Sequence, residues 1–144
     1  MVDEPEGFRD FVLSRSSDLL TTAWFLTGDA QRAQDLLQSA LARTWPHWSR
    51  VRNDQPEAYV WRVMVNLQAS WWRRRWSREV PVAEPQDLAA VEASSQVDER
   101  AILAAALRAV PVRQRQVWTL RHYHDLSPAQ VAVIMGCSEG TGIA

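Results

Sequence analysis

The sequence predicts an all-α protein built from two small helical domains, and three observations lead to this prediction. Apolar residues recur at intervals of three and four along most of the chain, which is the period of an amphipathic helix. Capping residues, such as Gly28 followed by Asp29, mark places where one helix ends and the next begins. No segment alternates apolar and polar residues for long enough to predict a sheet. We expect the domains at residues 1–78 and 98–144, joined by an acidic linker over 79–97.

Two helices are expected before residue 46. The first spans residues 7–27, and Gly28 ends it because glycine readily adopts the left-handed conformation found after a helix. Asp29 caps the second helix, which extends to about Trp45 before Pro46 disfavours its continuation. Residues 49–55, with the sequence SRVRNDQ, then predict a polar loop.

A long helix from Pro56 to Trp76 is the stretch around which we expect the chain to be organised. Pro56 suits the first turn of a helix, where a backbone N–H would have no partner. Arg62, Asn66 and Arg73 share one face at i, i+4 and i+11. A different face carries an apolar stripe of helical period, made of Val60, Val63, Met64, Leu67 and Trp71.

The residues after this helix change character. Residues 77–97 are acidic, contain two prolines and lack aromatic side chains, which predicts an extended linker. Helical patterns return from Asp98 and end in a helix-turn-helix, in which Ser127 caps the first helix and Gly136 forms the turn. Ser138 should cap the second, groove-reading helix, but only six residues follow it and two of them are glycine. We expect a helix of this length not to persist.

Charge lies in blocks, although the net charge of the 144-residue chain is only −1. Residues 43–78 hold eight Arg and two acidic residues, a block of +6 that can attract a polyanion, whereas residues 79–99 carry −6. The single cysteine, Cys137, excludes an internal disulfide and a cysteine-based zinc site. There is no signal peptide and no apolar run of about 20 residues, so we expect a cytoplasmic protein without membrane contact.

The Arg-rich block combines basic, aromatic and amide side chains, which favours capture of a single nucleic-acid strand. Arginine neutralises phosphates, indole rings stack on bases, and an asparagine amide can pair with a base edge. Some of these side chains also fit a structural role. Trp61 and Trp71 fit the core better than a base platform, and Arg73–Arg75 also fits a solvated helix end. Trp72 and Trp76 suit both roles. The predicted DNA-binding residues are Arg50, Arg52, Asn53, Arg62, Asn66, Trp72, Arg73, Arg74, Arg75, Ser138, Glu139 and Thr141.

No catalytic or cofactor-binding pattern is found in the sequence. It has no glycine-rich phosphate loop, and its Ser, His and Asp residues form no nucleophile motif. His122 and His124 lack a third ligand at a useful spacing, which argues against a metal site. We expect a protein that is not an enzyme and uses no cofactor.

Three stretches resemble a bacterial RNA polymerase sigma factor of the extracytoplasmic-function (ECF) type, and in particular the actinobacterial SigE-like group. The first two are GDAQRAQDLLQSALARTW and PEAYVWRVMVNLQASWWRRRW, and the third is LRAVPVRQRQVWTLRHYHDLSPAQVAVIMGCSEGT. Their order and separation over residues 7–141 make the resemblance specific. It implies a sigma subunit that directs RNA polymerase to promoters and initiates transcription.

The resemblance also implies a partner for each part of the chain. The loop at Arg50–Gln55 and the long helix would open the minus-ten promoter element and hold its non-template strand. The linker would run toward the RNA exit path, and the second domain would read the minus-thirty-five element as duplex. An anti-sigma factor would be a further partner. Docking on the clamp helices of the polymerase largest subunit would involve Asp35, Leu36, Leu37, Gln38, Leu41 and Trp45.

The end of the chain departs from the family pattern. Family members continue past the Gly-Thr pair with a valine and a basic helix, whereas Gly142, Ile143 and Ala144 follow here. We therefore expect a truncated or frameshifted sigma factor whose recognition helix is missing. One alternative is a protein that occupies polymerase or an anti-sigma partner without selecting promoters. A third interpretation, a stand-alone helix-turn-helix repressor, is disfavoured by the polymerase-docking segment and by the missing recognition helix.

Overall fold

The computed structural model describes residues 5–77 and 99–136, with the side chains of residues 72–77 excepted. The all-α prediction is confirmed, since no strand forms within these ranges. The N-terminal helices are α1 (Phe8–Thr27), α2 (Ala30–Thr44), a 3₁₀ turn η1 (Trp45–His47), α3 (Trp48–Val51) and α4 (Pro56–Ser77). The C-terminal helices are α6 (Glu99–Leu107), α7 (Val112–Trp118), a π-helical turn η2 (Thr119–Tyr123) and α8 (Pro128–Met135).

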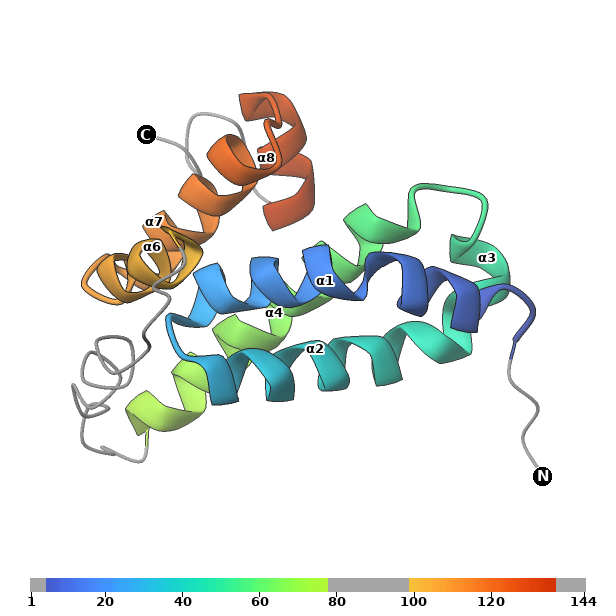
Figure 1. Ribbon diagram of the computed structural model, residues 1–144, viewed down its shortest axis with the longest axis horizontal. Helices are drawn as coiled ribbons and strands as arrows, with labels where there is room; N and C mark the ends of the chain where they lie inside the picture. The colour runs from blue at the N-terminus through green and yellow to red at the C-terminus, as the bar shows by residue number, and fades with distance from the viewer. Residues whose placement is uncertain (1–4, 78–98, 137–144) are drawn as a thin grey trace.

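A three-helix core holds the N-terminal helices together. Helices α1 and α2 lie side by side, joined by a short turn, and α4 crosses behind them (Figure 1). The apolar stripe predicted for the long helix lies in this core, with Val60 and Met64 fully buried. Leu19 and Leu26 of α1 and Leu36 of α2 pack on it. Burial of several aliphatic side chains, at roughly 1.5–3 kcal/mol each, is what orders α4 against its neighbours.

The turn between α1 and α2 has the predicted caps. Gly28 adopts φ 74° and ψ 8°, a left-handed conformation that glycine takes without steric cost, and its N–H bonds to the Trp24 carbonyl at 2.6 Å. The Asp29 carboxylate accepts the backbone N–H of Arg32 at 2.8 Å and so begins α2. Both sequence predictions are confirmed.

The polar loop predicted over residues 49–55 is shorter than expected, because α3 forms one helical turn within it. Trp48 accounts for the difference. Its side chain is 3% exposed, its indole N–H donates to the Glu6 carbonyl at 2.7 Å, and its ring packs edge-on to Phe8 with centroids 5.4 Å apart. Only residues 52–55 remain as an open connection between α3 and α4.

The C-terminal helices pack on the N-terminal helices rather than standing apart. In Figure 1 they lie against α1 and α4, with α8 above the start of α4. Helix α8 begins with the predicted cap. The Ser127 hydroxyl oxygen accepts a hydrogen bond from the Gln130 backbone N–H at 3.2 Å, and the Gln130 side-chain oxygen accepts one from the Ser127 backbone N–H at 2.8 Å. Gly136 ends α8 with φ 69°. The predicted linker and the second helix of the helix-turn-helix lie outside the described residues.

Candidate nucleic-acid interface

Helix α4 exposes the two central side chains of the predicted strand-binding face. Arg62 and Asn66 stand one turn apart, and both are exposed. The neighbouring positions Val60 and Met64 point the other way and are buried. The helical period thus separates a core face from a polar face on the same 22-residue element. A nucleic-acid strand can approach the polar face without unfolding the N-terminal core.

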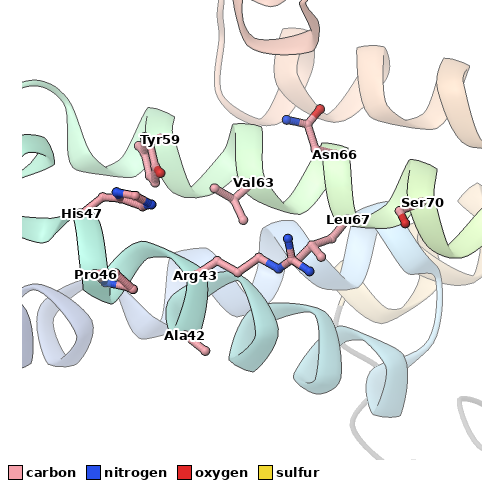
Figure 2. A pocket seen from close by; sticks show the side chains of 9 residues that line it. All are labelled: Ala42, Arg43, Pro46, His47, Tyr59, Val63, Asn66, Leu67 and Ser70. Atoms are coloured by element: carbon pink, nitrogen blue, oxygen red, sulfur yellow. The ribbon is translucent and has the colours of Figure 1, made fainter.

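A groove of about 490 Å³ lies between α2 and α4, beside that polar face (Figure 2). Arg43 extends along it from α2, and the rings of His47 and Tyr59 stand at one end with centroids 6.3 Å apart. Asn66 borders the groove but points away from α2, toward the ribbon of the C-terminal helices. A cation and two rings beside an amide can accept a phosphate and an unstacked base.

Arg43, His47 and Tyr59 were not among the predicted DNA-binding residues. Arg43 lies within the +6 block, so the sequence carried a weak signal for it. His47 and Tyr59 are 12 positions apart and on different elements, and only the fold brings them together.

The loop residues lie at the opposite end of α4 from its Arg-rich terminus. Arg50 belongs to α3, while Arg52 and Asn53 lie in the connection, and all three are exposed. Arg52 is also 3.7 Å from the Glu6 carboxylate, a surface pair of little energetic weight. Because 22 helical residues span about 33 Å, the predicted residues form a long track rather than one compact pocket. Such a track suits a strand of several nucleotides.

Seven predicted DNA-binding side chains lie outside the part of the chain that the structure describes. Trp72 and Arg73–Arg75 lie on the last turns of α4, where only the backbone is described. Ser138, Glu139 and Thr141 lie outside the described residues. The core interpretation of Trp61 and Trp71 is confirmed, since both are half-buried and pack against the core of the N-terminal helices.

The predicted polymerase-docking residues on α2 divide into two groups. Asp35 and Gln38 are exposed, Leu41 is half-buried, and Trp45 is 36% exposed. Trp45 follows the last residue of α2, and its ring stacks on the ring of Phe8.

Two docking residues need a correction. Leu36 is 0% exposed and Leu37 is 8% exposed, so both contribute to the core and cannot offer contact surface to a partner. The reason is the helical period, which turns these two leucines toward α1 and α4.

The described residues contain no cluster of His, Cys, Asp and Glu side chains suited to a metal ion. Within residues 5–77 and 99–136, every helix falls short of the length and apolarity that a membrane span requires.

Two family models match the chain. The model described as Sigma-70 region 2 matches residues 11–78, and the model described as Sigma-70, region 4 matches residues 100–141.

Similar curated proteins are also named as sigma factors. The RNA polymerase sigma-E factor of Streptomyces coelicolor is 38% identical over 135 residues, which cover 93% of this chain and 76% of the relative. The protein of the same name from Streptomyces antibioticus is also 38% identical over 135 residues, covering 93% of this chain and 75% of that protein. The ECF RNA polymerase sigma factor SigL of Mycobacterium tuberculosis is 31% identical over 122 residues, covering 81% and 69%. The chain thus spans about three quarters of the length of the sigma-E relatives.

Proposed function

The chain belongs to the ECF sigma factors of the sigma-70 family, which are promoter-directing transcription initiation factors rather than enzymes, and we propose that α4 is its strand-capturing element. In this proposal the Arg62–Asn66 face and the groove beside it hold the non-template strand of the opened minus-ten element. The observation that carries the proposal is the exposure of both side chains on a helix whose other face is locked in the core.

The energetics of melting explain why such a face is useful. An unpaired base loses a few kcal/mol of stacking and pairing when it leaves the duplex. Aromatic stacking returns roughly 1–3 kcal/mol per base, and Arg contacts to phosphate add a salt-dependent term. The groove offers Tyr59 and His47 for stacking and Arg43 for phosphate, and Asn66 offers an amide at its edge. The buried apolar stripe already fixes the backbone of α4, so the protein should lose little conformational entropy when the strand binds.

The exposed side of α2 supports a second part of the proposal. RNA polymerase is the partner of sigma factors, and we infer that α2 docks on the clamp helices of the largest subunit. Asp35 and Gln38 supply polar contacts, and Trp45 supplies exposed aromatic area next to them. Tryptophan at an interface rim buries a large area at low conformational cost, which suits a docking role.

The C-terminal helices would supply duplex recognition. Helix α8, capped by Ser127 and ended by Gly136, has the form of the first helix of a helix-turn-helix. We propose that this unit reads the minus-thirty-five element and that the linker runs through polymerase between the two DNA contacts.

Strand capture is tested by the affinity of the chain, assembled with core polymerase, for a labelled non-template minus-ten oligonucleotide. Arg62→Ala and Asn66→Ala should each weaken binding. Arg62→Ala should also reduce the salt slope, which is the slope of the logarithm of the binding constant against the logarithm of the salt concentration, because one phosphate contact is lost. Arg113→Ala and Gln114→Ala remove an exposed guanidinium and an exposed side-chain amide from α7, away from α2 and α4, and serve as controls. If Arg62→Ala keeps both the affinity and the salt slope of the wild type, α4 does not hold the strand by this face.

A further inference from the structure

The connection between α3 and α4 contains a residue in a backbone conformation that its side chain disfavours. Among the described residues other than glycine, only Gln55 and Asp125 have a positive φ, at 51° and 55°. An L-residue in this left-handed region brings its Cβ close to the carbonyl oxygen that follows, so the conformation costs free energy. Gln55 also precedes Pro56, and a residue before proline is normally extended. Two steric effects therefore strain the backbone at Gln55.

The Gln55 side chain does not account for this strain, since it is exposed. Contacts on both sides hold the backbone instead. Helix α3 ends at the buried Val51, whose carbonyl accepts the Asp54 N–H at 2.9 Å. The Gln55 carbonyl accepts the Tyr59 N–H at 3.2 Å, which ties it to the first turn of α4. A strained residue persists where its fixed neighbours leave the chain no easier route.

Two ion pairs fasten the ends of the same connection to the N-terminal part of the chain. Arg15 of α1 lies 3.2 Å from the carboxylate of Glu57 in the first turn of α4. Arg52 lies 3.7 Å from the carboxylate of Glu6. Each pair is weak by itself, because its side chains are partly exposed to water. Together with the burial of Val51, the two pairs restrict where residues 52–55 can lie.

This short connection carries two of the predicted DNA-binding residues. Arg52 and Asn53 are exposed, and Figure 1 shows the connection projecting from the packed helices at the start of α4. Guanidinium and amide groups suit contacts to a phosphate and to a base edge. A loop that changes shape freely would lose entropy when a strand binds, and the affinity would fall. A fixed loop beside α4 avoids that loss.

We propose that Gln55 is a positioning residue for strand binding, whose left-handed backbone sets the turn that holds Arg52 and Asn53 beside the start of α4. This inference rests on the proposed capture of the strand by α4. It extends the strand-binding surface from the Arg62–Asn66 face to the connection before the helix. Gln55 acts through its backbone rather than through a DNA contact of its own.

Substitutions that differ in their tolerance of positive φ test the proposal. Gln55→Val introduces a β-branched side chain, which resists the left-handed region and should force the connection into another shape. The chain assembled with core polymerase should then bind the labelled non-template minus-ten oligonucleotide about tenfold more weakly, the loss expected for one or two contacts. Gln55→Gly and Gln55→Asn both tolerate positive φ, so their affinity should stay within about twofold of the wild type.

Asp125→Val is the matched control, because it places the same side chain at the other strained position, between η2 and α8. Both valine variants should melt about 4–8 °C below the wild type, but only Gln55→Val should lose strand affinity. If Gln55→Val does not fold, Gln55→Ala, which opposes positive φ less strongly, takes its place.

A second measurement asks which residues Gln55 acts through. In a chain that carries both Arg52→Ala and Asn53→Ala, Gln55→Val should change the strand affinity by less than about twofold, because the groups that it positions are already absent. An undiminished loss in this background would overturn the positioning of these two residues.

The remaining outcomes separate this inference from the proposed function. Wild-type affinity in Gln55→Val, with Arg62→Ala still weakened, would overturn the positioning role and leave strand capture by α4 intact. An equal loss in Asp125→Val would overturn it as a general effect of lower stability. A loss in Gln55→Gly and Gln55→Asn as large as in Gln55→Val would mean that the glutamine side chain itself is needed, which also overturns it. Unchanged affinity in Gln55→Val and Arg62→Ala alike would instead refute the proposed function.

Discussion

Arg115 gives the most direct measure of how firmly the N-terminal and C-terminal helices are joined. It is 8% exposed, and its guanidinium donates to the Leu26 carbonyl at 2.8 Å and to the Val110 carbonyl at 2.9 Å. Burial, together with repulsion from Arg108 and Arg32, lowers the pKa of Arg115 from its usual value. The carbonyl end of α1 offsets that cost, because a helix C-terminus carries partial negative charge and α1 has no basic residue in its last turn.

We expect Arg115→Met to destabilise the folded chain by about 2–4 kcal/mol. The substitution keeps the aliphatic packing but leaves two carbonyls without this donor, at roughly 1–3 kcal/mol each. The Leu26 carbonyl keeps its hydrogen bond from the Gln68 amide, so we expect the free-energy cost at this carbonyl to be about 1 kcal/mol, the lower limit of that range. Arg115→Lys can reach one carbonyl but not both, so about 1–2 kcal/mol should be lost. At about 4 °C per kcal/mol for a protein of this size, the Met variant should melt about 8–16 °C lower.

Urea unfolding followed by circular dichroism measures these differences directly. Arg113→Met is the control, since it removes an exposed arginine from the same helix and should change the unfolding free energy by less than about 0.5 kcal/mol. A loss below about 1 kcal/mol for Arg115→Met, equal to that of Arg113→Met, would refute the hydrogen bonds of Arg115 as a stabilising contact between the N-terminal and C-terminal helices.

Three further predictions follow from the same contacts. Burial lowers the pKa of His124 to about 4, so the stability that its neutral ring contributes is full above pH 6.5 and is lost as the pH falls toward about 4. After a discount for partial exposure this loss is about 1–2 kcal/mol, and it should disappear from the pH dependence of urea unfolding in His124→Gln. Gly28→Ala should cost more unfolding free energy than Gly7→Ala, because both positions have positive φ but only at Gly28 would the new Cβ collide with the Arg108 side chain. Asp35→Arg should weaken binding to core polymerase about tenfold with a melting temperature close to that of the wild type; unchanged affinity would remove α2 from the docking surface.

Local sequence signals were sufficient for most of the helix boundaries. Gly28, Asp29, Pro56 and Ser127 begin or end helices as expected, because caps and proline act through bonds within a few residues. The stripe on α4 was predictable for the same reason, since its period is a property of one helix. The burial of Trp48 was not predictable, because its partners Glu6 and Phe8 are some 40 positions away and no local pattern indicates that contact.

The candidate site was predictable in part. Exposure of Arg62 and Asn66 follows from their position opposite the buried stripe of α4. The groove partners Arg43, His47 and Tyr59 were missed because their proximity depends on how α2 crosses α4. Leu36 and Leu37 were assigned to docking by resemblance alone, and the structure buries both of them against α1 and α4. Resemblance identifies the segment that contacts a partner, whereas burial decides which of its side chains can do so.

Helix α4 presents three faces with different surroundings in this fold. Each step of one residue turns about 100° around the axis, so a single helix presents a core face at Val60 and Met64, a packed face at Trp61 and Val65, and an exposed face at Arg62 and Asn66. The first face must stay buried for the chain to remain folded. The second is buried only while the C-terminal helices remain in place, and its neighbours are the residues proposed to hold DNA. The exposed face at Arg62 and Asn66 is open while both other faces stay packed, so a partner can bind there without separating the helices.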